Sequence, residues 1–227
     1  MHASADARRA GPMQQYMRSA LPYHGVNAPG LEAICRHRFA ELAFSNAASW
    51  QRTTLFLWRH ARFREERYAA IALSGIRAAR AYQTPAVLPM YEEIIVTGAW
   101  WDYVDSVAIH RVGPILRSDR TRMARTMRSW SRSEDMWKRR TSIICQVGSG
   151  VATDQALLYD CIEPSIESRE FFLRKAIGWA LRQHARLHPD EVARYVARNE
   201  KRLSGLSRRE ATRHLKHPPA AATRSSR

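Results

Sequence analysis

Apolar residues recur along the chain every three or four positions, which is the period of an amphipathic α-helix. In the segment 62–82 the apolar stripe includes Phe63, Tyr68 and Ile71, while most arginines and glutamates fall on other faces. Shorter segments with the same period predict helices at 86–96, 99–109, 119–130, 133–147, 151–162, 168–186 and 190–200. Ten glycines and ten prolines are too few for the many turns of a β-sandwich or barrel. The pattern therefore predicts an all-α fold.

Local signals for helix starts support these segments. Pro85 and Pro189 each predict the first turn of a helix. Proline is favoured there because a backbone N–H in the first turn has no hydrogen-bond partner within the helix. Ser207, with Glu210 three residues later, predicts a capping box at the start of a further helix.

Three tryptophans suggest how the helices are arranged. Trp101, Trp137 and Trp179 are separated by 36 and 42 residues. Stacked helix pairs of the HEAT or armadillo type repeat at roughly 40–47 residues. We therefore expect a right-handed superhelical solenoid of HEAT-like repeats with a concave face, and an ordinary helical bundle is the alternative.

Both ends of the chain have compositions typical of loose segments. We predict disordered tails at 1–10 and 217–227 and a single domain at 11–216. The chain lacks the apolar run of a signal peptide and any run approaching the about 20 residues that cross a bilayer. A cytoplasmic protein with no membrane contact is expected.

The charge balance points to a polyanion as partner. The chain carries 37 Lys+Arg against 21 Asp+Glu, a formal net charge of +16, and 45% hydrophobic residues. This composition is that of a folded basic domain, and nucleic acid is the commonest polyanion such domains bind. Codon bias explains arginine over lysine, but not the excess charge. The three cysteines form no CxxC pair and the histidines no HExxH motif, so neither a disulfide framework nor a metal is expected.

The excess charge is unevenly distributed. The stretch 90–110 has four acids and no lysine or arginine, whereas 111–140 has ten cations and three acids. A solvated basic surface is the simpler interpretation of such a run. Trp130 and Trp137 lie among the cations, however, and cations with flat stacking surfaces are typical of nucleic-acid sites.

Helical spacing places chemistry-bearing residues together inside the acidic stretch. On a helix, Trp100 aligns with Val104 in a core stripe, while Trp101 aligns with Asp105 on a neighbouring face. An indole and a carboxylate therefore stand side by side. The alternative is a core tryptophan next to a surface aspartate.

Two later helices show similar groupings. Trp137 and Arg140 share a helix face, and Trp179 is bracketed at helical spacing by Lys175, Arg182 and Arg186. The alternative for Trp179 is an indole that caps a neighbouring helix while the cations snorkel. Gly178 would permit close approach of another backbone.

With these residues the sequence resembles the AlkD family of DNA alkylation-repair glycosylases. The matching stretches run in family order from about residue 12 to 216: 13–17, 25–29, 64–65, 100–105, 137–140, 170–182 and 206–211. Departures are the turn at 26–30 and the arginine-rich region 117–133, which bear on substrate range and DNA register.

The resemblance implies an all-α superhelix of HEAT-like repeats whose concave face binds DNA, and it also implies an activity. The family excises cationic N3- and N7-alkylated purines, such as 3-methyladenine and 7-methylguanine, from duplex DNA without metal, nucleotide or other cofactor. It implies catalytic roles for Asp105, Trp101, Trp179 and Arg140, with Arg140 holding a flanking phosphate bidentately. A monofunctional enzyme is expected, since no lysine lies beside Asp105 in the sequence. We further expect a monomer.

DNA contacts are expected outside the catalytic group. By resemblance they include Tyr16 and Arg182, and the basic aromatic pattern adds Trp137, Arg139 and Lys175. Two other functions remain open on the sequence: a non-catalytic helical-repeat protein that recognises distorted duplexes, and a protein scaffold whose charge serves solubility or an acidic protein partner.

Overall fold

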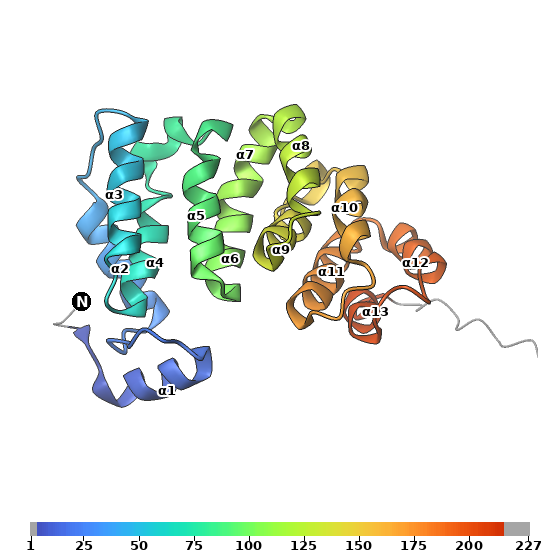
Figure 1. Cartoon of the computed structure of the whole chain (residues 1–227), viewed down its shortest axis with the longest axis horizontal. Helices are drawn as coiled ribbons and strands as arrows, with labels where there is room; N and C mark the ends of the chain where they lie inside the picture. Colours follow the sequence, from blue (N-terminus) through green and yellow to red (C-terminus); the bar gives the residue numbers. More distant parts are fainter. Residues whose placement is uncertain (1–3, 216–227) are drawn as a thin grey trace, which may run out of the picture. The chain divides into compact units, whose positions relative to one another are not determined.

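The structure, a computed structural model, describes residues 4–215, and all regular secondary structure in them is helical (Figure 1). The all-α prediction is confirmed. The predicted tail at 217–227 lies outside the described residues. The chain divides into two compact units, Met1–Thr97 and Gly98–Arg227, which are described separately below. The single domain expected at 11–216 stays a prediction.

Unit 1 contains the N-terminal helices. They are α1 (Ala7–Met17), α2 (Ala28–Phe39), α3 (Ala47–Arg59), α4 (Arg64–Leu73) and α5 (Leu88–Gly98), which ends at the unit boundary, with 3-10 turns at Arg77–Tyr82 and Pro85–Val87. The helical segment predicted at 62–82 is thus two elements. The break follows Ser74, whose hydroxyl donates to the carbonyl of Ile71 at 2.7 Å and whose own carbonyl accepts from Gln83 at 2.7 Å. These bonds give partners to backbone carbonyls at the end of α4, so the helix ends there. The apolar periodicity of the sequence nevertheless continues beyond this point.

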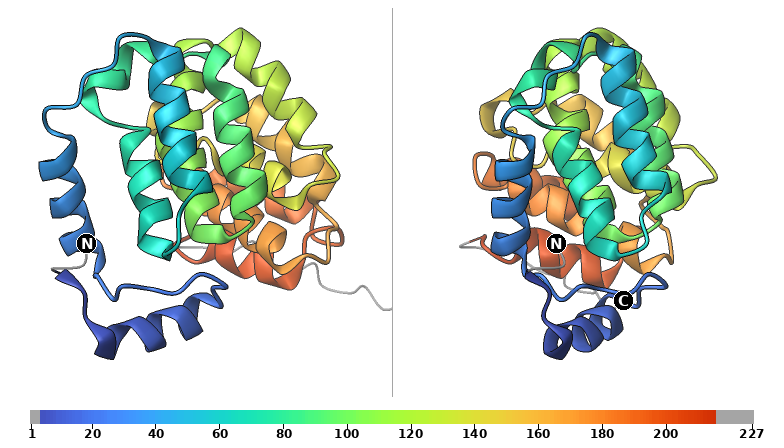
Figure 2. Two further views of the ribbon diagram at one scale, coloured as in Figure 1. Left: turned by 60° about the vertical axis from the view of Figure 1, so that its left-hand side comes forward. Right: turned by 90° about the vertical axis from the view of Figure 1, so that its left-hand side faces the viewer.

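The first helix begins earlier than the sequence indicated. The prediction of a tail at 1–10 is wrong for 7–10, because Asp6 caps α1 by accepting from the backbone N–H of Arg8 at 3.0 Å. The backbone N–H of Asp6 also donates to the carbonyl of His24 at 2.9 Å. Figure 2 shows α1 running across the end of α2 rather than alongside it. A short, small-residue sequence gives no apolar stripe from which this helix could be recognised.

A buried carboxylate holds the segment that joins α1 to α2. Glu65, fully buried on α4, accepts the backbone N–H groups of His24, Gly25 and Val26 at 3.1, 2.9 and 3.1 Å. Gly25 has φ +81°, and a Cβ there would lie 2.0 Å from the carbonyl oxygen of Asp6. Only glycine fits this close approach.

Unit 2 contains the remaining helices. They are α6 (Trp101–Val107), α7 (Gly113–Ser118), α8 (Arg120–Trp130), α9 (Met136–Ile144), α10 (Gln155–Ile162), α11 (Phe171–His184), α12 (Pro189–Arg198) and α13 (Gly205–Thr212), with a π-helix at Ala108–Val112 and 3-10 turns at Gly150–Ala152 and Glu163–Ser165. Every helix predicted between 99 and 200 is present, with ends displaced by a few residues. We find no helix in residues 4–215 long and apolar enough to cross a bilayer.

The helices of unit 2 pack in two rows. In the first row α6 contacts α9, α9 contacts α11, and α11 contacts α13. In the second row α7 contacts α8, and α8 contacts α10. Contacts of α8 and α10 with α9 join the rows, and Figure 1 shows α8 and α10 above α9 and α11. Stacked helix pairs produce this arrangement, as the repeat spacing predicted.

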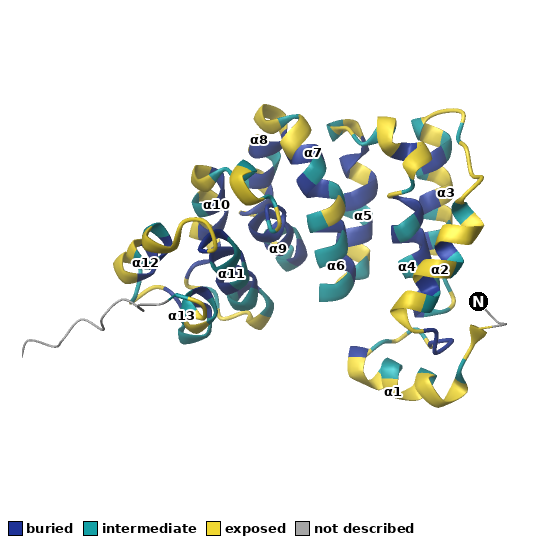
Figure 3. Cartoon of the chain, turned by 180° about the vertical axis from the view of Figure 1, so that it is seen from behind, coloured by how far each residue is buried: buried dark blue, intermediate teal, exposed yellow. Residues whose placement is uncertain are grey.

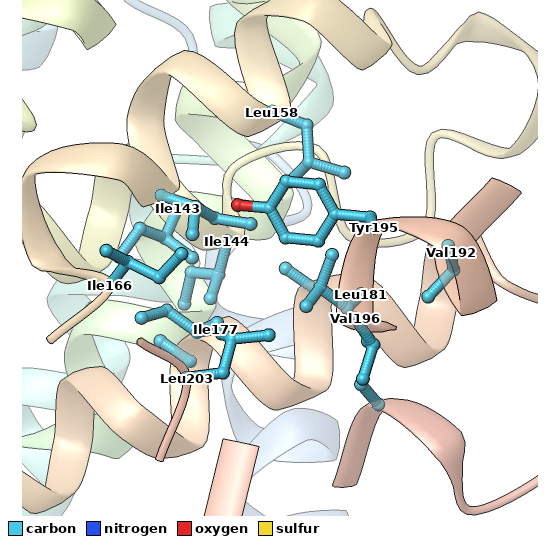
Figure 4. Packing of buried hydrophobic residues seen from close by; sticks show 14 of the residues in the cluster. Ile143, Ile144, Leu158, Ile166, Ile177, Leu181, Val192, Tyr195, Val196 and Leu203 are labelled. Carbon is cyan, nitrogen blue, oxygen red and sulfur yellow. The ribbon is translucent and has the colours of Figure 1, made fainter. Parts of the chain in front are cut away.

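Between α9, α10, α11 and α12 lies the main core of unit 2 (Figure 4). Ile143, Ile144, Ile177 and Leu181 are fully buried there. Gly178 lets α13 approach α11 as expected, because a Cβ on it would lie 2.5 Å from the Cβ of Glu210.

One predicted cap is wrong. The N-cap of α13 is Ser204, whose side chain accepts from the backbone N–H of Ser207 at 3.0 Å. Ser207 lies inside the helix, and its hydroxyl donates to the carbonyl of Arg174 at 2.9 Å, so it fastens α13 to α11 instead of capping. The start predicted at Pro189 is confirmed, and Pro85 begins a 3-10 turn.

Candidate functional site

Helix α6 carries the first two site residues. Trp101 and Asp105 are one turn apart and half-buried, while Val104 and Val107 are fully buried and fix the helix on its other side. The sequence prediction that Trp101 and Asp105 stand on a face distinct from the core stripe is confirmed.

A buried ion pair connects α6 to α9 and α11. The Nε and Nη2 atoms of Arg140 donate to the two carboxylate oxygens of Asp105, each at 2.7 Å. The Nη1 atom donates to the backbone carbonyl of Phe172 at 2.6 Å. The Arg140 side chain is 6% exposed and that of Asp105 is 14% exposed. Parallel two-bond pairing of this kind fixes the orientation of a carboxylate as well as its charge.

Burial is the largest influence on the pKa of Asp105. Removal of the carboxylate from water raises the pKa of Asp105 above its ordinary value, and the hydrogen bonds and charge of Arg140 act in the opposite direction. Asp105 is therefore easier to protonate than a surface aspartate.

The expected role of Arg140 as a bidentate phosphate clamp stays a prediction, and its guanidinium already has partners within the protein. Its Nε and Nη2 groups are already paired with Asp105, and Nη1 is bonded to Phe172. These bonds use three of the five N–H donors of the guanidinium, and the Arg140 side chain is 6% exposed. In this structure Arg140 positions Asp105.

Three aromatic residues pack next to this pair. The ring of Phe172 lies 5.6 Å from that of Trp100 in an edge-on arrangement and 5.0 Å from that of Trp137. Trp137 is 7% exposed, so the expected DNA contact of Trp137 must be corrected to a packing role. Trp130 is also buried, with the ammonium of Lys138 5.4 Å from its ring centroid. The stacking surface that the basic stretch suggested is therefore core.

On α11, Trp179 stands between cations that are already paired. Lys175 donates to Glu210 of α13 at 2.8 Å, and Arg182 donates to the other oxygen of the same carboxylate. The hydrogen bond from Lys175 lowers the pKa of Glu210 despite desolvation. Trp179 is half-buried and packs against the core of unit 2. It lies two helical turns beyond Phe172 on the same face of α11.

Two predicted DNA contacts fall outside this group. Arg139 lies on α9 and is half-buried. Tyr16 is 78% exposed on α1 in unit 1. Both contacts stay predictions, as do those of Lys175 and Arg182.

Sequence reasoning missed two residues of the site. Phe172 contributes a backbone carbonyl, which no side-chain pattern reveals. Glu210 is the one acid among the eight cations of 201–227, which was a usable signal that it pairs with a cation. Within residues 4–215 no group of three His, Cys, Asp or Glu side chains is arranged to hold a metal ion.

The fold and site together define an all-helical protein of stacked helix pairs, with a buried carboxylate held by an arginine next to several tryptophans. Comparison with known proteins makes this more specific. The family model described as DNA alkylation repair enzyme matches residues 1–215, and the chain belongs to that family. A solved structure titled "Predicted DNA alkylation repair enzyme from Enterococcus faecalis" is similar, with a TM-score of 0.83 and 25% identity over 94% of this chain and 97% of that chain. No match was found among curated proteins.

Proposed function

We propose that this protein is a monofunctional DNA glycosylase, which hydrolyses the N-glycosidic bond of cationic N3- and N7-alkylated purines in duplex DNA. The observation that carries the proposal is the Asp105 carboxylate, fixed by two 2.7 Å bonds from Arg140 and half-buried one helical turn from Trp101. Membership of the DNA alkylation repair enzyme family supports DNA as the substrate.

The leaving group needs little help from the protein. A purine alkylated at N3 or N7 carries a positive charge and departs as a neutral base when the bond between its nitrogen and C1′ breaks. Positive charge then develops on the deoxyribose, and water adds to C1′ with loss of one proton. A fixed carboxylate stabilises the developing charge and accepts that proton.

Asp105 keeps the capacity for this role despite its ion pair. Each carboxylate oxygen has a second lone pair beyond the one that Arg140 occupies, and the side chain is 14% exposed. Arg140 holds the carboxylate in one orientation and offsets the burial that raises the pKa of Asp105. We assign Arg140 as a positioning residue.

The tryptophans suit a cationic substrate. An indole face attracts a cation by about 0.5–2 kcal/mol, and both Trp101 and Trp179 keep part of their surface exposed. We propose that these two rings flank the charged nucleotide, and that Lys175, Arg182, Arg139 and Tyr16 contact the DNA backbone.

The test is base release. Purified protein is incubated with duplex DNA containing a single 7-methylguanine and then treated with alkali, which cleaves the strand at an abasic site. Cleavage that depends on the protein is expected. Duplex binding without base release would instead favour a non-catalytic DNA-binding protein, and absence of both would contradict the proposal.

A further inference from the structure

A row of arginines lies on α8, outside the candidate site. Arg122, Arg125 and Arg132 are exposed, and their spacing of three and seven residues places them on one helical face that continues into the turn after α8. Met123, Met127 and Trp130 occupy the opposite face and are buried. We call Arg122, Arg125 and Arg132, with Arg117 and Arg120 beside them, the α8 arginine surface.

The side chains of this surface donate to neutral oxygens where their hydrogen bonds are known. Arg117 donates to the hydroxyl of Ser149, and Arg120 donates to the carbonyl of Ala152, each at 3.0 Å. Arg132 donates to the carbonyl of Arg128 at 3.0 Å. Within residues 4–215 no carboxylate forms a salt bridge with any of the five. Some other exposed arginines differ in this respect, and Arg202, for example, pairs with both Glu163 and Glu167.

This surface is on the other row of helices from the site. Asp105, Arg140 and Trp179 belong to α6, α9 and α11 of the first row, whereas α8 belongs to the second row. The buried face of α8 packs toward its neighbours, and Figure 3 shows exposed residues on its outer side. The exposed side of α8 is therefore opposite the side that packs against α9, the helix that carries Arg140.

We propose that the α8 arginine surface binds the phosphate backbone of a second segment of duplex DNA, separate from the one at the candidate site. Guanidinium groups that donate to neutral oxygens keep further N–H donors for phosphate oxygens, and release of condensed counterions favours the contact. The inference rests on duplex DNA being the partner, as in the proposed function, but not on base release.

A bridging experiment tests this. A duplex is immobilised on beads, the full-length protein is bound at low occupancy, and a second, fluorescent duplex is added. Wild-type protein should capture the second duplex. R122Q/R125Q/R132Q should reduce capture at least tenfold while still binding the immobilised duplex. R194Q/R198Q/R213Q, which removes the same charge from exposed positions of α12 and after α13, is the matched control and should capture normally.

Each other outcome contradicts the inference. Equal losses in the two triple variants would mean that only net charge matters. Failure of the wild type to capture while it binds the beads would mean that one duplex is bound. Loss of binding to vesicles containing phosphatidylserine, with DNA capture unchanged, would assign the surface to a membrane instead. Base release measured in parallel separates this inference from the proposed function. Capture of the second duplex without base release would contradict the proposed function and support this inference.

Discussion

At the scale of single residues, Asp105 and Arg140 form a largely buried ion pair, and its energetics differ from those of a surface pair. Breaking a buried pair leaves an uncompensated charge in a poorly solvated place, whereas an exposed pair contributes little. The pair is also asymmetric in role, since only Asp105 keeps lone pairs for a substrate while Arg140 is engaged by its protein partners.

Replacement of Asp105 by asparagine should separate binding from chemistry. The amide keeps the shape but lacks the charge that stabilises the transition state, so the single-turnover rate of 7-methylguanine release should fall by about 10²–10³-fold. Affinity for the duplex, measured by fluorescence anisotropy, should change little. Equal rates for D105N and wild type would remove Asp105 from the mechanism.

Loss of Arg140 should cost stability. Arg140→Gln removes the cation from the buried carboxylate, and we expect the free energy of unfolding in urea to fall by about 3–5 kcal/mol. Arg202→Gln, at an exposed pair, serves as control and should leave the free energy of unfolding almost unchanged. The double variant D105N/R140Q should recover part of the loss, because no buried charge is then unpaired; an additive loss would contradict the ion-pair argument.

The pH dependence of base release should follow the protonation state of Asp105. The pKa of Asp105 is raised above the ordinary 3.8. As pH falls, the carboxylate should therefore gain its proton while the pH is still above 3.8. The rate of base release, corrected for spontaneous loss, should decline over the same pH range. A raised folded-state pKa also means that the group favours folding at low pH and that this contribution is lost as pH rises through the folded pKa. A pH profile of D105N should lack the decline, and a profile shared by both proteins would point to another group.

At the scale of elements, the contact of α11 with α13 depends on a missing side chain. A Cβ on Gly178 would lie 2.5 Å from the Cβ of Glu210 and 3.0 Å from the carbonyl oxygen of Ser207. The carboxylate that pairs with Lys175 and Arg182 is thus held against α11 by a close helix approach that depends on glycine.

Gly178→Ala should therefore lower the free energy of unfolding by about 1–3 kcal/mol, in spite of the better helix propensity of alanine. Gly11→Ala in α1 is the matched control, since nothing lies within 4 Å of its added Cβ, and it should be neutral or stabilise by about 0.5–1 kcal/mol. Urea unfolding measures both variants. A Gly178→Ala protein as stable as wild type would show that α13 moves away without cost.

Helix periods were predicted well and helix ends less well. α8 and α12 have strong apolar stripes, and their predicted segments match within two residues. α4 ends at Leu73 because the backbone carbonyl after it finds Gln83, a residue outside the helix. Such partners are contributed by the folded chain, so a local pattern does not reveal them.

At the scale of the whole molecule, the net charge of +16 should determine how strongly the protein binds DNA. The acidic stretch within it is less negative than the sequence suggested. Glu93 pairs with Arg59 at 2.6 Å in unit 1, and Asp105 pairs with Arg140 in unit 2. Arg128 of α8 pairs with Asp160, whereas the five members of the α8 arginine surface form no salt bridge within the described residues.

Affinity for undamaged duplex DNA should depend steeply on salt. If about 6–10 phosphates are contacted, affinity should fall by about 10³–10⁵ between 50 and 200 mM salt. Anisotropy titrations measure this, with polyglutamate as a competitor of similar charge. A shallow dependence, or displacement by polyglutamate as effective as by DNA, would favour the protein-scaffold interpretation.

The sequence alone determined the all-α fold, the positions of most helices and the grouping of Trp101 with Asp105, because these depend on spacing within one helix. It did not reveal that Arg140 is bound to Asp105 and Phe172, that Trp137 is buried, or that Glu210 pairs with Lys175 and Arg182. These contacts join residues about 30 positions apart on different helices. Only tertiary packing brings them within hydrogen-bond distance, and only there does burial decide whether a charged or aromatic side chain meets a substrate or its own protein.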